Sequence, residues 1–248
     1  MKILVSGLGG FMGREIAALA AAGYCGAELA GGVDPNGSRE YPDLCVGSFD
    51  EAPTDVDCIL DFSHHAATPE LTAFAVKNAL PLVIATTGQT AEELELIKAA
   101  SKEIPLFFAA NYSLGVALLV ELAKRTASLF PEADVEIVET HHNRKIDAPS
   151  GTALTLAREI ASVRDGARIT TGRSGIGARQ KGDIGVQSVR MGNIVGIHEV
   201  HVCTANQTIT LRHEAHSRAL FAEGALTAAA WLMSRDAGLY DMKDLMKQ

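Results

Sequence analysis

The first half of the chain alternates short apolar runs with helical segments, and this alternation restricts the possible folds more than any other feature. Lys2–Val5 predicts a strand, Phe11–Ala22 a helix, and Ala27–Val33 a second strand that ends at Asp34. The same order continues in strand Cys58–Phe62, helix Thr68–Ala79, strand Leu82–Ala85, a helix from the capping box Thr90–Glu93 to Ala100, and strand Leu106–Ala109. Repeated strand–helix–strand units have parallel strands with right-handed crossovers. We therefore expect an α/β architecture with a Rossmann-like, doubly wound parallel sheet.

The pattern changes after Asn111, where a second domain is expected. The predicted elements are helix Leu114–Phe130, strand Val135–Thr140, a helix from Ser150 to about Val163, strands Val186–Met191, Ile194–Val202 and Thr208–His213, and the alanine-rich helix Leu220–Met233. Between them, Thr171–Gly185 holds five glycines and predicts a long mobile loop. Strands joined by short turns indicate a mixed or antiparallel sheet, and hence an α+β domain.

Composition and charge exclude several classes of protein. The net charge of −8 makes the chain a poor general ligand for nucleic acid, and any anionic substrate needs a local concentration of positive charge. No run reaches the roughly 18 apolar residues of a membrane span, and the N-terminus does not resemble a signal peptide. The four cysteines form no C-x-x-C pair, which favours free thiols in a reducing cytoplasm over disulfides or a zinc site.

A glycine-rich turn, Gly7–Gly13, follows the first strand and opens the first helix. Such a turn directs main-chain N–H groups and the positive end of the helix dipole at a pyrophosphate. The spacing is G-x-x-G-x-x-G rather than G-x-G-x-x-G, but an acid at the end of the second strand, Asp34, suits the ribose hydroxyls of NAD. The alternative is a turn needed only for close packing of strand and helix. The candidate cofactor residues here are Gly7, Leu8, Gly9, Gly10, Phe11, Met12 and Asp34.

Two later strand ends are expected on the same crevice, because ligands of doubly wound sheets bind at the carboxyl ends of the strands. Small and hydroxyl-bearing residues there can line a nicotinamide–ribose site, although each segment taken alone could be a simple turn. The candidates are Ala85, Thr86, Thr87, Ala109, Ala110, Asn111 and Tyr112.

The segment Glu139–Ala153 concentrates positive charge in an acidic chain, with two histidines, an arginine and a lysine between His141 and Lys145. A helix start follows at once. With Ser150 as the N-cap, the first N–H groups of that helix have no partner within the helix and form an anion pocket. Histidine titrates near pH ~6.5, which suits proton donation at neutral pH. The pattern predicts a carboxylate-binding site beside a titratable group, with His141, His142, Lys145, Ser150, Gly151 and Thr152 as candidates.

Two other interpretations of this segment remain open from the residues alone. The histidine pair could be half of a metal site, but His198–His201 does not follow the H-E-x-x-H pattern and no third ligand has a suitable spacing, so no metal is expected. The segment could also be a solvated basic face beside an ordinary helix cap.

Taken in order along the whole chain, these motifs resemble the 4-hydroxy-tetrahydrodipicolinate reductase family, also called dihydrodipicolinate reductase, of the diaminopimelate route to lysine. The segment His141–Ala153 is similar to the signature of that family. Other matching segments are the glycine turn, Asp61–Ser63, Thr86–Gly88, Asn111–Ser113, Arg190–His198 and His213–Arg218.

The resemblance implies an activity and a domain organisation. It implies a cytoplasmic enzyme that uses NADH or NADPH to reduce 4-hydroxy-tetrahydrodipicolinate, a cyclic dicarboxylate, to tetrahydrodipicolinate. Residues 1–112 with 219–248 would bind the dinucleotide. Residues 113–218 would bind substrate and join a homotetramer through the central sheets, and the domains would close over substrate. By family roles, His141 is the proton donor and acceptor, Lys145 a second donor that polarises the ring nitrogen, and His142, Gly151 and Thr152 hold the carboxylates.

Two departures from the family pattern bear on cofactor choice, and a third, at Ala85, is a small change. Phe11 and Pro35 stand where the family often has basic residues, and Ala85 replaces a glycine. The 2′-phosphate of NADPH would lie against Asp34, and Arg39 is the nearest cation in sequence that could offset it. We therefore expect NADH to be preferred, with NADPH possible. The alternatives are a non-catalytic NAD(H)-binding regulator and another two-domain dehydrogenase of the amino-acid type.

Overall fold

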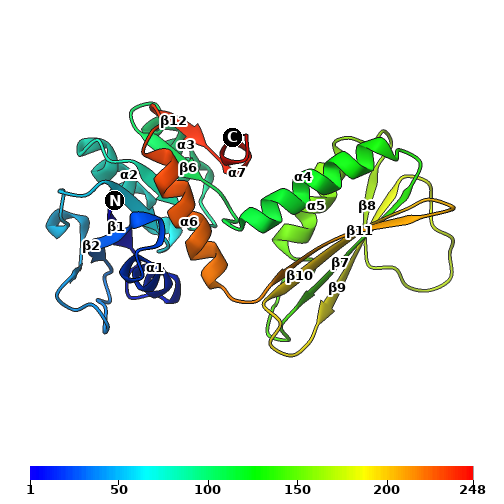
Figure 1. Ribbon diagram of the computed structural model, residues 1–248, viewed down its shortest axis with the longest axis horizontal. Coiled ribbons are helices and arrows are strands. Elements are labelled where there is room, and N and C mark those ends of the chain that lie inside the picture. Colours follow the sequence, from blue (N-terminus) through cyan, green and yellow to red (C-terminus); the bar gives the residue numbers. More distant parts are fainter. Residues whose placement is uncertain (248) are drawn as a thin grey trace. The chain divides into compact units, whose positions relative to one another are not determined.

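The computed structural model describes residues 1–247, which divide into two compact units (Figure 1). Unit 1 comprises Met1–Ser113 together with Ala219–Gln248, and unit 2 comprises Leu114–Arg218. The chain therefore leaves unit 1 once, builds unit 2 from one continuous segment, and returns.

Within the described residues, unit 1 is built on a seven-stranded parallel sheet with the order β12-β6-β5-β4-β1-β2-β3. The strands are β1 (Lys2–Ser6), β2 (Glu28–Val33), β3 (Cys45–Val46), β4 (Cys58–Asp61), β5 (Leu82–Ile84), β6 (Pro105–Phe108) and β12 (Gly238–Tyr240). Leaving β12 aside, this is the Rossmann order, in which the direction of winding reverses between β1 and β4. The doubly wound sheet expected from the sequence is confirmed.

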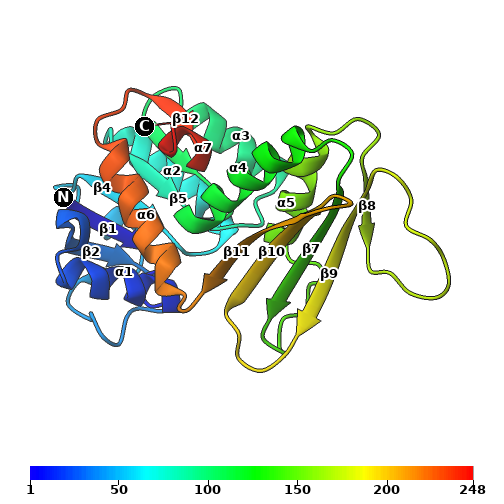
Figure 2. The ribbon, with the colours of Figure 1, turned by 45° about the vertical axis from the view of Figure 1, so that its right-hand side comes forward.

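Helices cover both faces of this sheet (Figures 1 and 2). One face carries α1 (Phe11–Ala21) and α6 (Ala219–Leu232), and the other carries α2 (Thr68–Lys77) and α3 (Ala91–Ala100). The capping box of α3 is present, with the Glu93 N–H donating to Thr90 Oγ1 at 3.2 Å and the Thr90 N–H donating to Glu93 Oε2 at 2.8 Å. A short helix, α7 (Met242–Leu245), follows β12.

Unit 2 is a five-stranded mixed sheet with the order β11-β10-β7-β9-β8 and two helices on one face (Figure 2). The elements are α4 (Leu114–Leu129), β7 (Asp134–His141), α5 (Gly151–Ala161), β8 (Arg168–Thr171), β9 (Asp183–Arg190), β10 (Gly196–Cys203) and β11 (Thr208–Ala215). Strand β10 runs antiparallel to both neighbours, whereas β7, β9 and β8 are parallel. This confirms the expected α+β class, and alternate residues of β7 are buried under the helices.

The predicted loop Thr171–Gly185 was too long. Strand β8 extends to Thr171 and β9 begins at Asp183, so only residues 172–182 connect them. Gly185 is a residue of β9 that pairs with Glu136 on β7, and the Glu136 carboxylate fills the space that a Cβ at position 185 would occupy. The glycine therefore leaves room for a neighbouring side chain within the sheet. No helix among the described residues is long and apolar enough to cross a membrane.

Within unit 1, helix α6 packs closely against the main chain of Tyr112 at Gly224, where an added Cβ would lie 1.7 Å from the Tyr112 carbonyl oxygen. We expect Gly224→Ala to lower the free energy of unfolding by about 1–3 kcal/mol, the usual effect of overpacking, although alanine favours a helix. Gly47→Ala is the control, because Gly47 is exposed and its Cβ would meet nothing within 4 Å. Urea unfolding measures both variants, and equal stabilities would contradict the steric argument.

Candidate active site

The residues that follow the strands of unit 1 lie side by side at one edge of the sheet. The Gly7 N–H donates to Val33 O at 2.8 Å, and the Ala85 N–H donates to Asp61 O at 2.9 Å. The glycine turn after β1 and the segment after β5 therefore share the carboxyl edge of the sheet, where doubly wound proteins bind ligands.

The glycines of the turn serve the packing of the chain itself. Gly7 has φ +85°, and Cβ atoms at Gly7 and Gly13 would lie 2.6 Å from Phe62 O and 2.2 Å from Gly7 O. The glycines alone therefore fit the packing alternative. At the start of α1, the N-cap residue Gly10 provides no side-chain cap for the first helical turn. An uncapped helix N-terminus is suited to a phosphate.

Asp34 is connected to the turn by its carboxylate. It accepts hydrogen bonds from the Gly9 N–H at 3.0 Å and from the Asn36 N–H at 2.9 Å, and it is 9% exposed. Arg39, in the same loop, is exposed. The acid predicted for the ribose thus lies directly beside the glycine turn.

Two of the predicted cofactor residues have side chains in the core of unit 1. Tyr112 is 2% exposed and its hydroxyl donates to Ile84 O at 2.9 Å, while Leu8 is fully buried against Gly32. These two side chains therefore pack beneath the loops at the carboxyl edge of the sheet and are not exposed to a ligand. Phe11, by contrast, is 49% exposed.

In unit 2, three strands and one helix bring polar residues to one end of the sheet. His141 ends β7 and pairs with Arg190 at the end of β9, and Glu139 pairs with His198 on β10. The N-cap of α5 joins them, because the Ser150 N–H donates to Glu139 Oε1 at 3.2 Å.

The carboxylate of Glu139 is completely buried and carries most of this network. It accepts a hydrogen bond from His141 Nδ1 and a bidentate pair from Arg190, at 2.9 Å from Nη1 and 2.7 Å from Nη2. Burial alone raises the pKa of Glu139, but hydrogen bonds from His141, Arg190 and Ser188 outweigh it and hold that pKa well below the usual range. An ionised carboxylate on Nδ1 directs the Nδ1–H inward and leaves Nε2 as the reactive atom of the ring.

The two basic neighbours of His141 have different environments. Lys145 Nζ lies 2.8 Å from Asp147 Oδ1, and this hydrogen bond lowers the pKa of Asp147. His142 has a lowered pKa because of burial and then the charges of Arg144 and Arg218, so its imidazole is neutral at pH 7. Lysine and histidine thus offer a charged and a neutral donor on the same loop.

The predicted helix cap is present. Ser150 Oγ accepts the Ala153 N–H at 3.2 Å, and the first turn of α5 contains no acidic residue. A Cβ at Gly151 would meet nothing within 4 Å, so the first residue of the helix is open to a close approach. The N-terminus of α5 therefore has the form of an anion site.

Four residues at this end of unit 2 were not assigned a role from the sequence: Glu139, Asp147, Arg190 and His198. Glu139 lies two residues before His141 on one strand, so strand alternation could have placed both on the same face. Arg190 and His198 lie far away in sequence, and only the strand register brings them in. Among residues 1–247, no three His, Cys, Asp or Glu side chains are arranged to hold a metal ion.

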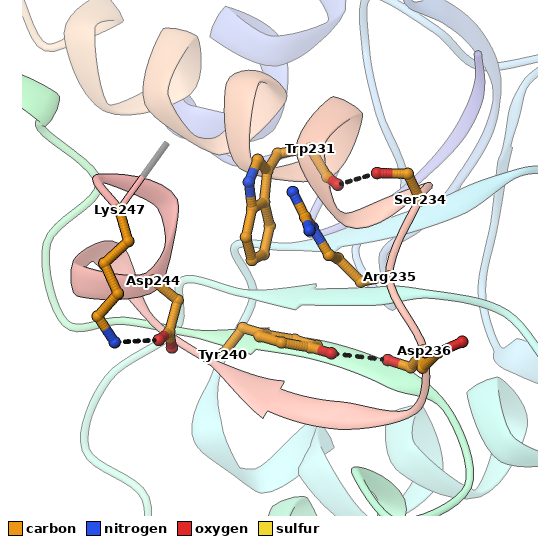
Figure 3. Close-up of a pocket in the computed structure, with 7 residues that line it drawn as sticks. All are labelled: Trp231, Ser234, Arg235, Asp236, Tyr240, Asp244 and Lys247. Carbon is orange, nitrogen blue, oxygen red and sulfur yellow. Dashed lines mark hydrogen bonds and ion pairs between the residues drawn. The ribbon is translucent and has the colours of Figure 1, made fainter.

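A separate hollow of about 550 Å³ lies beside β12, at the end of α6 (Figure 3). Its main feature is the Arg235 guanidinium, stacked 4.1 Å above the centre of the Trp231 ring. Its other lining residues are Ser234, Asp236, Tyr240, Asp244 and Lys247. It contains none of the residues predicted from the sequence, so it is distinct from both candidate sites.

The geometry agrees with comparisons to protein families. Residues 1–112 match the family model "Dihydrodipicolinate reductase, N-terminus", and residues 115–246 match "Dihydrodipicolinate reductase, C-terminus". The chain belongs to the dihydrodipicolinate reductase family. This confirms the resemblance found in the sequence.

Relatives in the family match over the full length. The chain is 42% identical to a 4-hydroxy-tetrahydrodipicolinate reductase of Caldanaerobacter subterraneus, over 100% of this chain and 99% of the relative. It is 40% identical to one from Clostridium perfringens, over 100% and 98%. A dihydrodipicolinate reductase structure from Paenisporosarcina, described as dipicolinate-bound, matches with a TM-score of 0.79 and 27% identity over 97% of each chain.

One more distant structure bears on the alternative dehydrogenase. Aspartate dehydrogenase from Thermotoga maritima matches with a TM-score of 0.52 and 16% identity, covering 95% of this chain and 98% of that one. At this identity the likeness concerns the fold alone, so it does not compete with membership of the dihydrodipicolinate reductase family.

The Glu139–Arg190 pair generates a stability prediction. Removing one partner of a buried ion pair leaves an uncompensated charge, so Arg190→Ala should cost about 3–5 kcal/mol of unfolding free energy at pH 7. Arg14→Ala, which breaks an exposed pair with Glu40, should cost about 0–1 kcal/mol.

The same pair predicts a dependence on pH. The folded pKa of Glu139 lies below its unfolded value of about 4.3, so its stabilisation is complete above that pH and is lost as pH falls through the folded value. The difference in the free energy of unfolding between the wild type and Arg190→Ala, measured with urea, should therefore become smaller as the pH is lowered into the acid range. A difference independent of pH would show that the ion pair is not its source.

Proposed function

We propose that this chain reduces 4-hydroxy-tetrahydrodipicolinate to tetrahydrodipicolinate in the diaminopimelate route to lysine, with NADH as the preferred cofactor. One observation carries the assignment to a catalyst: His141 is held by a buried, ionised carboxylate beside the N-terminus of α5. A regulator that only bound NAD(H) would have no use for an oriented proton donor, and the relatives at 40–42% identity are named as reductases.

The cofactor is a pyridine nucleotide, and the residues at the carboxyl edge of unit 1 fit it. The uncapped start of α1 suits a pyrophosphate, and Asp34 beside Gly9 suits the adenosine ribose. When bound, the reduced nicotinamide supplies the hydride. The proposed cofactor residues are Gly7, Leu8, Gly9, Gly10, Phe11, Met12, Asp34, Ala85, Thr86, Thr87, Ala109, Ala110, Asn111 and Tyr112. Of these, Leu8 and Tyr112 would contact the cofactor through main-chain atoms, because their side chains are buried.

The substrate residues lie in unit 2, which we propose as the substrate domain, with unit 1 as the dinucleotide domain. The N-terminus of α5 at Gly151 and Thr152 would bind one carboxylate through main-chain N–H groups, with Ser150 holding the helix start. His142 would donate a hydrogen bond to a carboxylate. The neighbouring cations supply the local positive charge that an acidic chain needs for a dianionic substrate.

The chain's own part in the reaction is to deliver protons and to hold the ring. In this reaction the substrate loses its 4-hydroxyl as water, and a hydride and a proton are consumed. The imidazolium of His141, stabilised by the Glu139 carboxylate, would give its Nε2 proton to the substrate and become neutral. Lys145, released from Asp147 by the incoming dianion, donates to the ring nitrogen and makes the ring a better acceptor.

Assembly and location complete the proposal. The face of the unit 2 sheet opposite α4 and α5 carries half-exposed apolar side chains, including Val138 and Ile197. This face suits the joining of subunits into a homotetramer. An enzyme of amino-acid synthesis with four free cysteines suits the reducing cytoplasm.

Turnover tests the proposal directly. Purified protein, NADH and the product of the preceding synthase are mixed, and nicotinamide absorbance is followed. We expect turnover in the wild type and a loss of about 10²–10⁴-fold in His141→Ala and Lys145→Ala, with NADH affinity unchanged. Lys98→Ala, in an exposed pair with Glu95, is the control and should keep full activity. NADH binding without turnover in the wild type would favour the regulator instead.

Cofactor preference is a separate prediction. A 2′-phosphate would place negative charge against Asp34, and Phe11 and Pro35 cannot offset it. Arg39 is exposed, and surface ion pairs contribute only about 0–1 kcal/mol. We expect a higher kcat/KM for NADH than for NADPH at fixed ionic strength, and a further loss for NADPH in Arg39→Ala. A wild type that prefers NADPH would refute the argument from Asp34.

A further inference from the structure

A second histidine, His198, is buried beside the proposed proton donor and has no role in the mechanism above. It lies on β10, is 4% exposed, and its ring meets that of His141 edge to face with the centres 5.1 Å apart. Its Nε2 lies 3.2 Å from Ser150 Oγ. His198 thus connects the middle of the sheet to the cap of α5.

The surroundings of His198 keep it neutral. Its pKa is lowered to about 4, first by burial and then by the proximity of His141, with smaller contributions from His213 and Lys145, while Glu139 opposes them. The groups that face it come from β7, from β11 and from the loop after β7. A neutral ring adds no second cation beside His141 and does not compete with it for the proton.

The hydrogen bonds of His198 are incomplete, which speaks against a purely structural role. Among the described residues, its buried Nδ1 has no hydrogen-bond partner. An apolar residue of similar shape would avoid the cost of leaving that atom unsatisfied. An apolar residue at position 198 could not make the hydrogen bond to Ser150 Oγ, so this bond is the reason to have a histidine there.

Besides the helical bond from the Leu154 N–H to its carbonyl, Ser150 makes three hydrogen bonds. Of these, the bond to His198 joins the Ser150 hydroxyl to a side chain on the sheet. The Ser150 main-chain N–H donates to Glu139, its Oγ accepts the Ala153 N–H, and the same Oγ meets His198 Nε2. These contacts orient the residue immediately before Gly151, where α5 begins.

We infer that His198 is a positioning residue that holds Ser150, and through it the N-terminus of α5, in the orientation that binds a substrate carboxylate. The inference rests on the proposed function, since it assigns that N-terminus to the substrate. His198 touches neither the cofactor nor the reacting atoms in this role. It acts through Ser150 alone.

A double-mutant cycle tests the inference, with pyridine-2,6-dicarboxylate (dipicolinate) as the probe and calorimetry as the readout. His198→Phe keeps the ring but loses the bond to Ser150 Oγ. We expect it to weaken dipicolinate binding about tenfold, the effect of one hydrogen bond, and to raise KM similarly with a smaller change in kcat. In a Ser150→Ala background the same change should have little further effect, because the two residues act as one unit.

Further readouts separate positioning from a general loss of structure. His198→Gln carries its amide to the place of Nε2 and should restore most of the affinity, whereas the shorter His198→Asn should not. These two variants also decide the question if His198→Phe fails to fold. NADH affinity and the pH profile of kcat should stay as in the wild type, since His198 donates no proton to the substrate in this role.

Several outcomes would overturn the inference. They are independent, additive effects of the Ser150 and His198 changes, equal dipicolinate binding by the Gln and Asn variants, or a shifted pH profile of kcat. If the wild type turns over substrate and one of these outcomes is found for the variants, the proposed function stands and only the inference about His198 is wrong. A wild type that binds no dipicolinate removes both.

Discussion

The carboxylate of Glu139 connects three parts of unit 2 that lie apart in the sequence. It accepts hydrogen bonds from the imidazole of His141 on its own strand, from the guanidinium of Arg190 on β9, and from the main-chain N–H of Ser150 at the start of α5. A fully buried carboxylate without such partners would be very costly, so these donors must all be in place when the unit is folded. One carboxylate thereby joins two strands, the start of a helix and a histidine whose Nδ1–H it orients.

Unit 1 prepares its site by a different means. Its candidate residues act mainly through the main chain, at the carboxyl ends of parallel strands and at an uncapped helix start. The glycines at Gly7 and Gly13 remove steric conflicts within the protein, and the side chains of Leu8 and Tyr112 fill the space underneath. One unit therefore offers oriented main-chain dipoles and the other offers titratable side chains.

Local sequence patterns predicted the elements whose formation depends on local chemistry. The alternation of apolar runs and helices predicted the parallel sheet, and the caps at Thr90 and Ser150 were confirmed where the sequence indicated them. The missed strands, β3, β8 and β12, have between two and four residues, too few for a periodic pattern, and each lies at the edge of its sheet beside a longer strand. Within the site, His141 and Lys145 were recognisable by their neighbours in sequence, whereas Arg190 and His198 depend on strand register, which no local pattern contains.

The return of α6 to unit 1 has a consequence for how the protein is made. A ribosome completes residues 1–113 long before it reaches Ala219, so β4, β5 and β6 are synthesised without the helix that covers one of their faces. Unit 2 is continuous in sequence and has all its parts as soon as Arg218 is added. Chains usually fold domain by domain from the N-terminus during synthesis. Here the domain begun first can only be finished last, and its apolar face stays open to a chaperone, or to another nascent chain, throughout the translation of the domain inserted into it.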